Sequence, residues 1–246
     1  MEPVLREKEH IETISDRLRL IVSPEHTFGT DALLLAAFAL PKRGGNVCDL
    51  GAGCGIIPFY WLARGVQRAT AVELQAQAAD QMVRSARLSG ITDRLRVVNA
   101  DLRRLGGILP EGAFDAVSMN PPYFKAGHGI TSSAEADAIA RHETETTLED
   151  CCECAAKLLK YGGSFSVCMP PARLAETVCA MREAKMEPKR LRFVSKNADA
   201  APWLFLLESK KGRAPGMTVE NPLFLYGPDG GETEALREIT APYRKD

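Results

Sequence analysis

Short apolar runs alternate with longer segments of helical periodicity through most of the chain. The apolar runs have the length of buried strands and lie at 46–50, 69–74, 95–101, 114–120 and 163–169. Apolar residues recur at helical spacing at 56–65, 75–90, 147–162 and 173–186. Two further runs, at 189–195 and 203–211, are close enough in sequence to form a hairpin.

This alternation predicts an α/β fold in which helices cover both faces of a mostly parallel sheet. Five strands and the hairpin together form a Rossmann-like, seven-stranded sheet with an antiparallel hairpin at one edge. We expect a single domain over 1–246, with an N-terminal extension at 1–24, a core at 25–211 and a C-terminal decoration at 212–246. The extension contains the alternation LRLIV, which predicts one short strand.

Local signals mark helix boundaries and one long loop. Thr146 and Glu149 have the spacing of a capping box, and two glycines at 162–163 predict where that helix stops. Thr30 or Asp31 is expected to cap a helix ahead of an apolar run. The polar stretch at 125–144 interrupts the pattern, and a loop of that length is typically a functional lid or disordered.

The composition is that of a folded globular protein. Of 246 residues, 45% are hydrophobic and 26% charged, and the formal net charge is −1. These values exclude extensive disorder and argue against a protein that simply coats nucleic acid. The longest apolar run is too short to cross a membrane and the N-terminus is charged, so we expect a cytoplasmic protein with no membrane partner.

The cysteines do not have the spacing of a metal site. There are seven, an odd number, without regular intervals. Cys151, Cys152 and Cys154 form a cluster, but no second pair of ligands accompanies them. We interpret them as small buried helix residues and expect no metal.

A glycine-rich turn follows the first strand of the core, in the sequence DLGAGCG. Asp49 is followed by Gly51, Gly53 and Gly55. Glycines at a strand-to-helix turn let main-chain N–H groups approach a ligand closely. The spacing departs from the G-x-G-x-x-G of dinucleotide sites, and tight packing alone would also explain it.

Acidic residues end the next two strands. Glu73 ends the second strand and Asp101 the third, at the sheet edge where α/β proteins bind ligands. A carboxylate at the first position can accept hydrogen bonds from ribose hydroxyls, and one at the second can accept from an adenine amino group. With the glycine turn, they indicate an adenosine-shaped site.

The fourth strand ends on a rigid corner, Asn120, Pro121, Pro122, Tyr123 and Phe124. Two prolines fix the main chain and remove two N–H donors. The side-chain oxygen of Asn120 and the carbonyl of Pro121 could then accept the two hydrogens of a flat amine, and Tyr123 could stack on a base. A plain turn is the alternative for the motif alone.

The corner and the adenosine-shaped site together resemble the class I S-adenosylmethionine-dependent methyltransferases that act on amino groups. The resemblance implies that the three glycines line the methionine half of S-adenosylmethionine. It implies that Glu73 holds the ribose, that Asp101 holds the adenine, and that Asp49 and Asn120 also contact the cofactor. Asn120, Pro121, Pro122 and Tyr123 are the implied catalytic residues.

Longer segments narrow the resemblance to one subfamily. HTFGTDALLLAAFA at 26–39 and LFLYGPDGGETEALREI near the C-terminus resemble the tRNA(Val) adenine-N6 methyltransferases, which modify adenosine 37 beside the anticodon. A tRNA anticodon loop is the implied partner. An rRNA guanine-N2 methyltransferase, a protein glutamine-N5 methyltransferase and an inactive RNA-binding module stay open as alternatives.

Several residues have candidate roles in binding. Thr30, at a helix N-terminus, could help to receive the cofactor's carboxylate. Tyr123, Phe124 and Arg141 are candidates for substrate binding. We interpret His128 and His142 as solvated or loop-anchoring rather than as general bases, and the sequence leaves the oligomeric state open.

Overall fold

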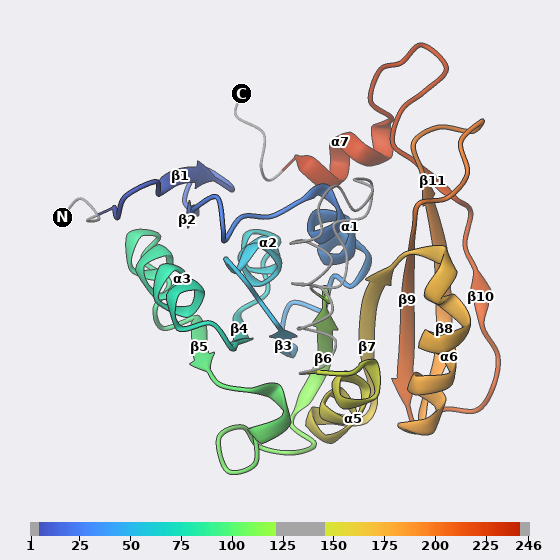
Figure 1. Ribbon diagram of the computed structural model, residues 1–246, viewed down its shortest axis with the longest axis horizontal. Helices are drawn as coiled ribbons and strands as arrows, with labels where there is room; N and C mark the ends of the chain where they lie inside the picture. The colour runs from blue at the N-terminus through green and yellow to red at the C-terminus, as the bar shows by residue number, and fades with distance from the viewer. Residues whose placement is uncertain (1–4, 122–145, 242–246) are drawn as a thin grey trace, which may run out of the picture.

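A computed structural model describes residues 5–121 and 146–241 of the chain. Its elements follow the alternation expected from the sequence (Figure 1). In chain order they are β1 (His10–Thr13), β2 (Arg19–Val22), α1 (Thr30–Phe38), β3 (Asn46–Leu50), α2 (Ile56–Ala63), β4 (Arg68–Glu73), α3 (Ala76–Leu88), β5 (Leu95–Asn99), β6 (Phe114–Met119), α5 (Leu148–Leu158), β7 (Leu159–Met169), α6 (Leu174–Glu183), β8 (Met186–Ser195), β9 (Leu204–Lys211), β10 (Thr218–Val219), β11 (Leu223–Phe224) and α7 (Glu234–Thr240).

The main sheet contains the seven expected strands in the order β8-β9-β7-β6-β3-β4-β5. All neighbours pair in parallel except β9, which is antiparallel to both β7 and β8. The α/β fold with an antiparallel hairpin is therefore confirmed. The strand count differs, because β10 and β11, each two residues long, also pair with β8.

The C-terminal segment covers the outer edge of this sheet. The main-chain N–H of Glu220 donates to the carbonyl of Leu191, and that of Tyr226 donates to Lys196. These bonds satisfy groups that an edge strand would otherwise leave unpaired. Leu225 and Leu236 are buried in the same core cluster as residues of α1 and α2, so this segment is packed on the core.

Two apolar clusters lie on opposite faces of the sheet. One contains side chains from α1, α2 and α3, and the other contains those from α5 and α6. Figure 1 shows the first group of helices separated from the second by the strands. With both faces covered, the loops at the carboxyl ends of the parallel strands form the exposed edge at which a ligand can bind.

Two boundaries around α5 differ from expectation. The capping box joins Thr147 and Asp150, not Thr146 and Glu149, with the Thr147 hydroxyl accepting from the Asp150 N–H and the Asp150 carboxylate accepting from the Thr147 N–H. The helix ends at Leu158, and β7 begins at the next residue. The two glycines at 162–163 therefore do not stop a helix; they lie within β7, where its pairing with β6 is irregular.

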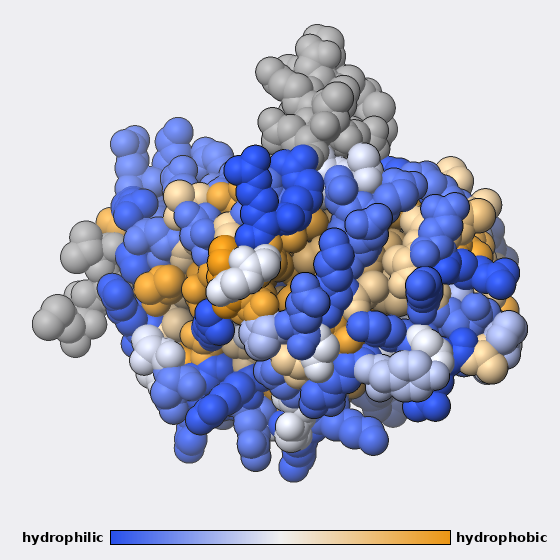
Figure 2. All heavy atoms as spheres, turned by 90° about the horizontal axis from the view of Figure 1, so that it is seen from below, coloured by the Kyte–Doolittle hydropathy of each residue, from blue (hydrophilic) through white to orange (hydrophobic). Residues whose placement is uncertain are grey.

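The face shown in Figure 2 consists mostly of hydrophilic residues, with hydrophobic residues visible between them. Within the described parts of the chain, no helix has both the length and the apolar character needed to span a bilayer.

Candidate functional site

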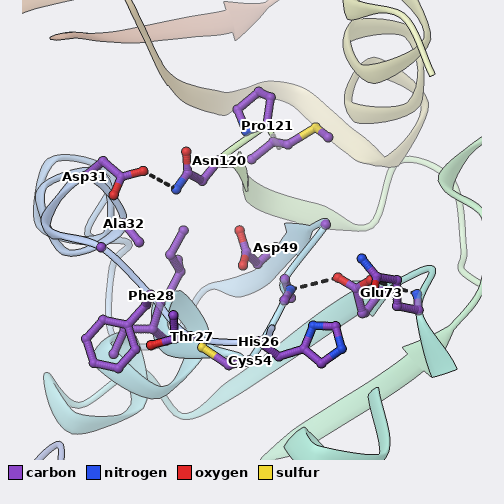
Figure 3. A pocket seen from close by; sticks show the side chains of 18 of the residues that line it. His26, Thr27, Phe28, Asp31, Ala32, Asp49, Cys54, Glu73, Asn120 and Pro121 are labelled. Carbon is purple, nitrogen blue, oxygen red and sulfur yellow. Dashed lines mark hydrogen bonds between the residues drawn. The ribbon is translucent and has the colours of Figure 1, made fainter. Parts of the chain in front are cut away.

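A cavity of about 700 Å³ lies where the carboxyl ends of β3, β4 and β6 meet the start of α1. Figure 3 shows side chains from these segments converging on it. Most residues that the sequence singled out line this cavity. They are Thr30, Asp49, Gly51, Gly53, Glu73, Asp101, Asn120 and Pro121.

The glycine turn has a conformation that other residues adopt at a cost. Gly51, Gly53 and Gly55 have φ values of 63°, 54° and 93°, in the left-handed region where a Cβ atom is unfavourable. Gly55, which we expected to face the cofactor, is not among the lining residues. It precedes α2, and a Cβ there would lie 2.8 Å from Cγ of Met82, so its role is in packing.

Glu73 joins the turn to the next strand. One carboxylate oxygen accepts from the Gly53 N–H and the other from the Gln75 N–H, each at 2.7 Å. The residue is buried, with 6% of its surface exposed. A carboxylate offers about four acceptor positions, so these two bonds leave capacity for ligand hydroxyls.

Asp101 lies at the cavity but is already paired. Its carboxylate accepts from the Arg103 N–H at 2.9 Å and forms an ion pair with the Arg103 guanidinium at 2.6 Å. Hydrogen bonding by Arg103 lowers the pKa of this carboxyl group. An adenine amino group would share the carboxylate with Arg103.

Asp49 is the most deeply buried acid of the cavity wall. It is 1% exposed, and the Ser118 hydroxyl donates to it at 2.5 Å. Burial raises its pKa to about 8; the Ser118 bond opposes the rise, and the charge of Glu73 adds to it. The sequence carried a signal for this pair, because Asp49 and Ser118 are polar residues inside apolar runs, and they are register partners on adjacent strands.

The N-cap residue of α1 differs from the one expected from the sequence. Gly29, not Thr30 or Asp31, is the N-cap, and its conformation is extended, without a side-chain cap bond. Thr30 and Asp31 lie in the first turn, and both line the cavity. The first-turn N–H groups still provide donors for an anion.

Two side chains hold Asn120 in place, and Figure 3 shows one of them, Asp31. Its side-chain nitrogen donates to the Asp31 carboxylate at 2.8 Å, and its side-chain oxygen accepts from the Cys168 thiol at 3.1 Å. Pro121 follows it, buried and at the cavity. Neither partner of Asn120 was expected from the sequence. The remaining predicted residues lie outside the described residues: Pro122, Tyr123, Phe124, His128, Arg141 and His142.

Several apolar residues that line the cavity were not expected from the sequence. Phe28 precedes α1, Trp203 comes from the hairpin and Leu225 from the C-terminal segment, and all three line the same cavity. No local pattern distinguishes them from ordinary core residues, since their position depends on how distant segments pack.

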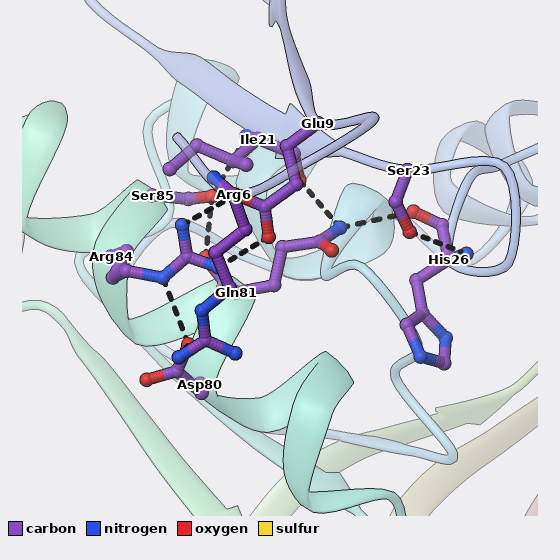
Figure 4. A network of polar contacts seen from close by, with 9 residues as sticks. All are labelled: Arg6, Glu9, Ile21, Ser23, His26, Asp80, Gln81, Arg84 and Ser85. Atoms are coloured by element: carbon purple, nitrogen blue, oxygen red, sulfur yellow. Dashed lines mark hydrogen bonds and ion pairs between the residues drawn. The ribbon is translucent and has the colours of Figure 1, made fainter. Parts of the chain in front are cut away.

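A polar network on α3 supports one side of the cavity (Figure 4). The buried Gln81 side chain donates to the carbonyls of Ile21 and His26 at 2.7 and 3.0 Å. Arg84 pairs with Glu9 of the N-terminal segment, and this bond lowers the pKa of Glu9. Because His26 belongs to a segment that lines the cavity, α3 positions that wall.

Several basic residues of β8 and β9 have structural partners. Arg190 pairs with Glu208 and Glu220. Lys189 donates to the carbonyl of Ala214, and Lys211 to that of Leu159. These basic residues therefore do not form one free basic patch.

Known proteins resemble this chain over most of its length. Curated relatives from Shewanella woodyi and Shewanella sp. (strain MR-4), both named tRNA1(Val) (adenine(37)-N6)-methyltransferase, are 30% and 29% identical. The matches cover 88% and 87% of this chain and 91% and 90% of the relatives.

A solved structure of a "predicted O-methyltransferase" from Agrobacterium tumefaciens has the same fold, with a TM-score of 0.71 and 22% identity, over 88% of this chain and 98% of the other. The family model described as methyltransferase small domain matches residues 25–173. This range contains the glycine turn, the acids and the corner, and the chain belongs to the methyltransferase small domain family.

Proposed function

We propose that this protein transfers a methyl group from S-adenosylmethionine to N6 of adenosine 37 in a valine tRNA. The observation that carries the proposal is that Gly51 and Gly53 of the glycine turn, Glu73, and the corner of Asn120 and Pro121 line one cavity of about 700 Å³. The binding groups for a nucleoside and the acceptors for an amine are therefore in the same space.

The residues present fit S-adenosylmethionine. This cofactor, when bound, supplies a methyl group on a positively charged sulfur. Glu73 has acceptor capacity for ribose hydroxyls, and Asp49 offers a carboxyl group to a positive charge. The first turn of α1, with Thr30, offers N–H and hydroxyl donors to a carboxylate.

The corner prepares the amine. The lone pair of an exocyclic amine is delocalised into the ring, which makes the nitrogen a poor nucleophile. The Asn120 side-chain oxygen and the Pro121 carbonyl can accept its two hydrogens, and this localises the lone pair on nitrogen. Positioning and preorganised hydrogen bonds are effective in catalysis because they need no rearrangement during the reaction.

The substrate is inferred from the relatives. Those that match 87–88% of this chain are named for adenine 37 of tRNA1(Val). A base in an anticodon loop is unpaired, so turning it into a cavity costs less free energy than it does from a duplex.

A methyl-transfer assay with labelled S-adenosylmethionine tests the proposal. We expect N6-methyladenosine in unmodified tRNA(Val) and none in the same tRNA with guanosine at position 37. Ribosomal RNA and a release factor are assayed in parallel. Labelled N2-methylguanosine or methylglutamine would indicate one of the other enzymes, and cofactor binding without any transfer would indicate an inactive module.

A further inference from the structure

Three side chains from separate segments meet at the corner. Asp31 is on α1, Asn120 follows β6, and Cys168 is on β7. The Asn120 side chain contacts Asp31 through its nitrogen at 2.8 Å and Cys168 through its oxygen at 3.1 Å. In Figure 3 the Asn120 nitrogen is directed at Asp31 and the oxygen away from it.

The chemistry of these partners distinguishes the two ends of the amide. A carboxylate accepts hydrogen bonds and has no hydrogen to donate, whereas a thiol can donate one. Turning the Asn120 amide over would place its oxygen against the Asp31 carboxylate and its NH2 group against the thiol. The orientation with nitrogen toward Asp31 is therefore the one that both partners favour.

The surroundings keep both partners in these roles. Burial is the main cause that raises the pKa of the Cys168 thiol well above its usual value, followed by the charges of Asp31 and Asp49, so the thiol keeps its hydrogen at neutral pH. Gly29 makes room for Asp31, because a Cβ atom there would collide with the Asp31 carboxylate.

We propose that Asp31 is a positioning residue that holds the Asn120 amide with its oxygen available to the substrate amine, with Cys168 supporting the same orientation. The proposal rests on the proposed function of the corner. A carbonyl oxygen has two lone pairs, so the thiol leaves one for the amine. In the reversed orientation the Asn120 NH2 group would face the amine, and two donors would oppose each other.

Exchanging the two side chains is the main test. Asp31→Asn replaces the charge-assisted hydrogen bond that fixes the Asn120 amide with a weaker neutral contact, and we expect kcat on unmodified tRNA(Val) to fall by about 10- to 100-fold, the range for one hydrogen bond to a charged group. Asn120→Asp alone places two carboxylates together and also lowers kcat. The double variant D31N/N120D restores a donor facing an acceptor, and we expect kcat to recover at least tenfold over the poorer single variant.

A matched control and a second readout separate this role from others. Asp115→Asn removes a carboxylate that pairs with Lys160 at the other end of β6 and leaves kcat unchanged. Hydrogen exchange of the Asn120 side-chain NH2 group, measured by NMR without substrate, should be slow in the wild type and at least tenfold faster in Asp31→Ala.

The proposal is overturned if Asp31→Asn and Asp31→Ala both keep kcat within threefold of the wild type, or if Asp31→Ala leaves the amide exchange unchanged. A double variant that folds but recovers nothing also overturns it, since Asp31 would then act on the cofactor rather than through Asn120. If the exchanged pair does not fold, Asp31→Ala decides the question. A wild type that is inactive on every tRNA but shows the expected exchange would contradict the proposed substrate alone.

Discussion

One wall of the cavity, formed by Gly51, Gly53 and Glu73, is held together by main-chain donors, whereas the facing corner is held by side chains. We call these the cofactor wall and the corner wall; the latter consists of Asp31 and Asn120 at the cavity, with the buried Cys168 hydrogen-bonded to Asn120. Gly53 and Glu73 are 20 residues apart, while Asp31 and Asn120 are 89 apart. The cofactor wall therefore depends on one short motif and its neighbouring strand, and the corner wall depends on three elements packing correctly.

The largest expected effect is a loss of transfer rate in Asn120→Ala, which tests whether the two walls act independently. Asn120→Ala removes the side-chain acceptor of the corner, and we expect kcat to fall by roughly 10²- to 10³-fold, as when one preorganised hydrogen-bonding group is deleted from an active site. The cofactor wall keeps all its contacts, so the Kd for S-adenosylmethionine should stay within about threefold, an estimate for a site whose polar contacts are retained. Single-turnover transfer and calorimetry measure the two quantities.

A variant that lost cofactor affinity as strongly as rate would show that the two walls act as one. A variant with a rate close to that of the wild type would show that Asn120 is not an acceptor for the amine.

For Glu73→Ala we expect the opposite result, weaker cofactor binding with little change in the transfer rate. It removes the acceptor for the N–H groups of Gly53 and Gln75 and for ligand hydroxyls. Hydrogen bonds to charged groups contribute about 1.5–3 kcal/mol, so we expect the Kd for S-adenosylmethionine to rise by roughly 10- to 100-fold. The transfer rate at saturating cofactor should change much less.

Glu73→Gln is the matched control, because it keeps one oxygen acceptor and the size of the side chain. Its Kd should lie between those of the wild type and Glu73→Ala. If saturating cofactor does not restore the rate of the alanine variant, the cofactor wall also orients the amine.

The pH dependence of stability and of cofactor binding tests whether Asp49 responds to the charge of the cofactor. Asp49 has a pKa of about 8 against an ordinary value of 3.8, so the folded protein holds a proton that the unfolded chain loses near pH 4. The free energy of unfolding should therefore decrease as pH rises from about 4 to 8.

A positively charged ligand favours the ionised form of Asp49. Binding of the cofactor therefore releases this proton, and the affinity for the cofactor increases with rising pH.

The expected gain in affinity from pH 6.5 to 7.5 is at most about tenfold, the limit for one proton. Asp49→Asn should flatten both profiles. If calorimetry in buffers of different ionisation enthalpy shows no proton release from the wild type, Asp49 does not sense the cofactor's charge.

The difference between the walls also explains what could be predicted from sequence. The parallel sheet and the glycine turn follow from periodicity and local spacing, which are properties of contiguous residues. The contacts of Asn120 with Asp31 and Cys168 depend on how α1 and β7 pack against the end of β6. An aspartate in a helix and a cysteine in an apolar strand have many ordinary explanations, so no local pattern identifies them.

Even local signals can be ambiguous by one position. Thr146 and Thr147 each precede an acid by three residues, as Glu149 and Asp150 follow in order. The sequence allows either capping box, and the structure has the second, with Thr146 at the cavity. Leu148 and Cys151, in the first turn after this cap, are both buried in the core.

The smallest expected effect is at this cap, which belongs to neither wall. Thr147→Ala removes the hydroxyl that accepts from the Asp150 N–H, and we expect the free energy of unfolding to fall by about 1 kcal/mol. Thr147→Ser keeps the oxygen and should retain most of the stability in denaturant titrations. Because Thr147 is not among the cavity-lining residues, the cofactor Kd and kcat of the alanine variant should equal those of the wild type. A change in kcat would mean that the corner wall depends on the start of α5 as well as on α1 and β7.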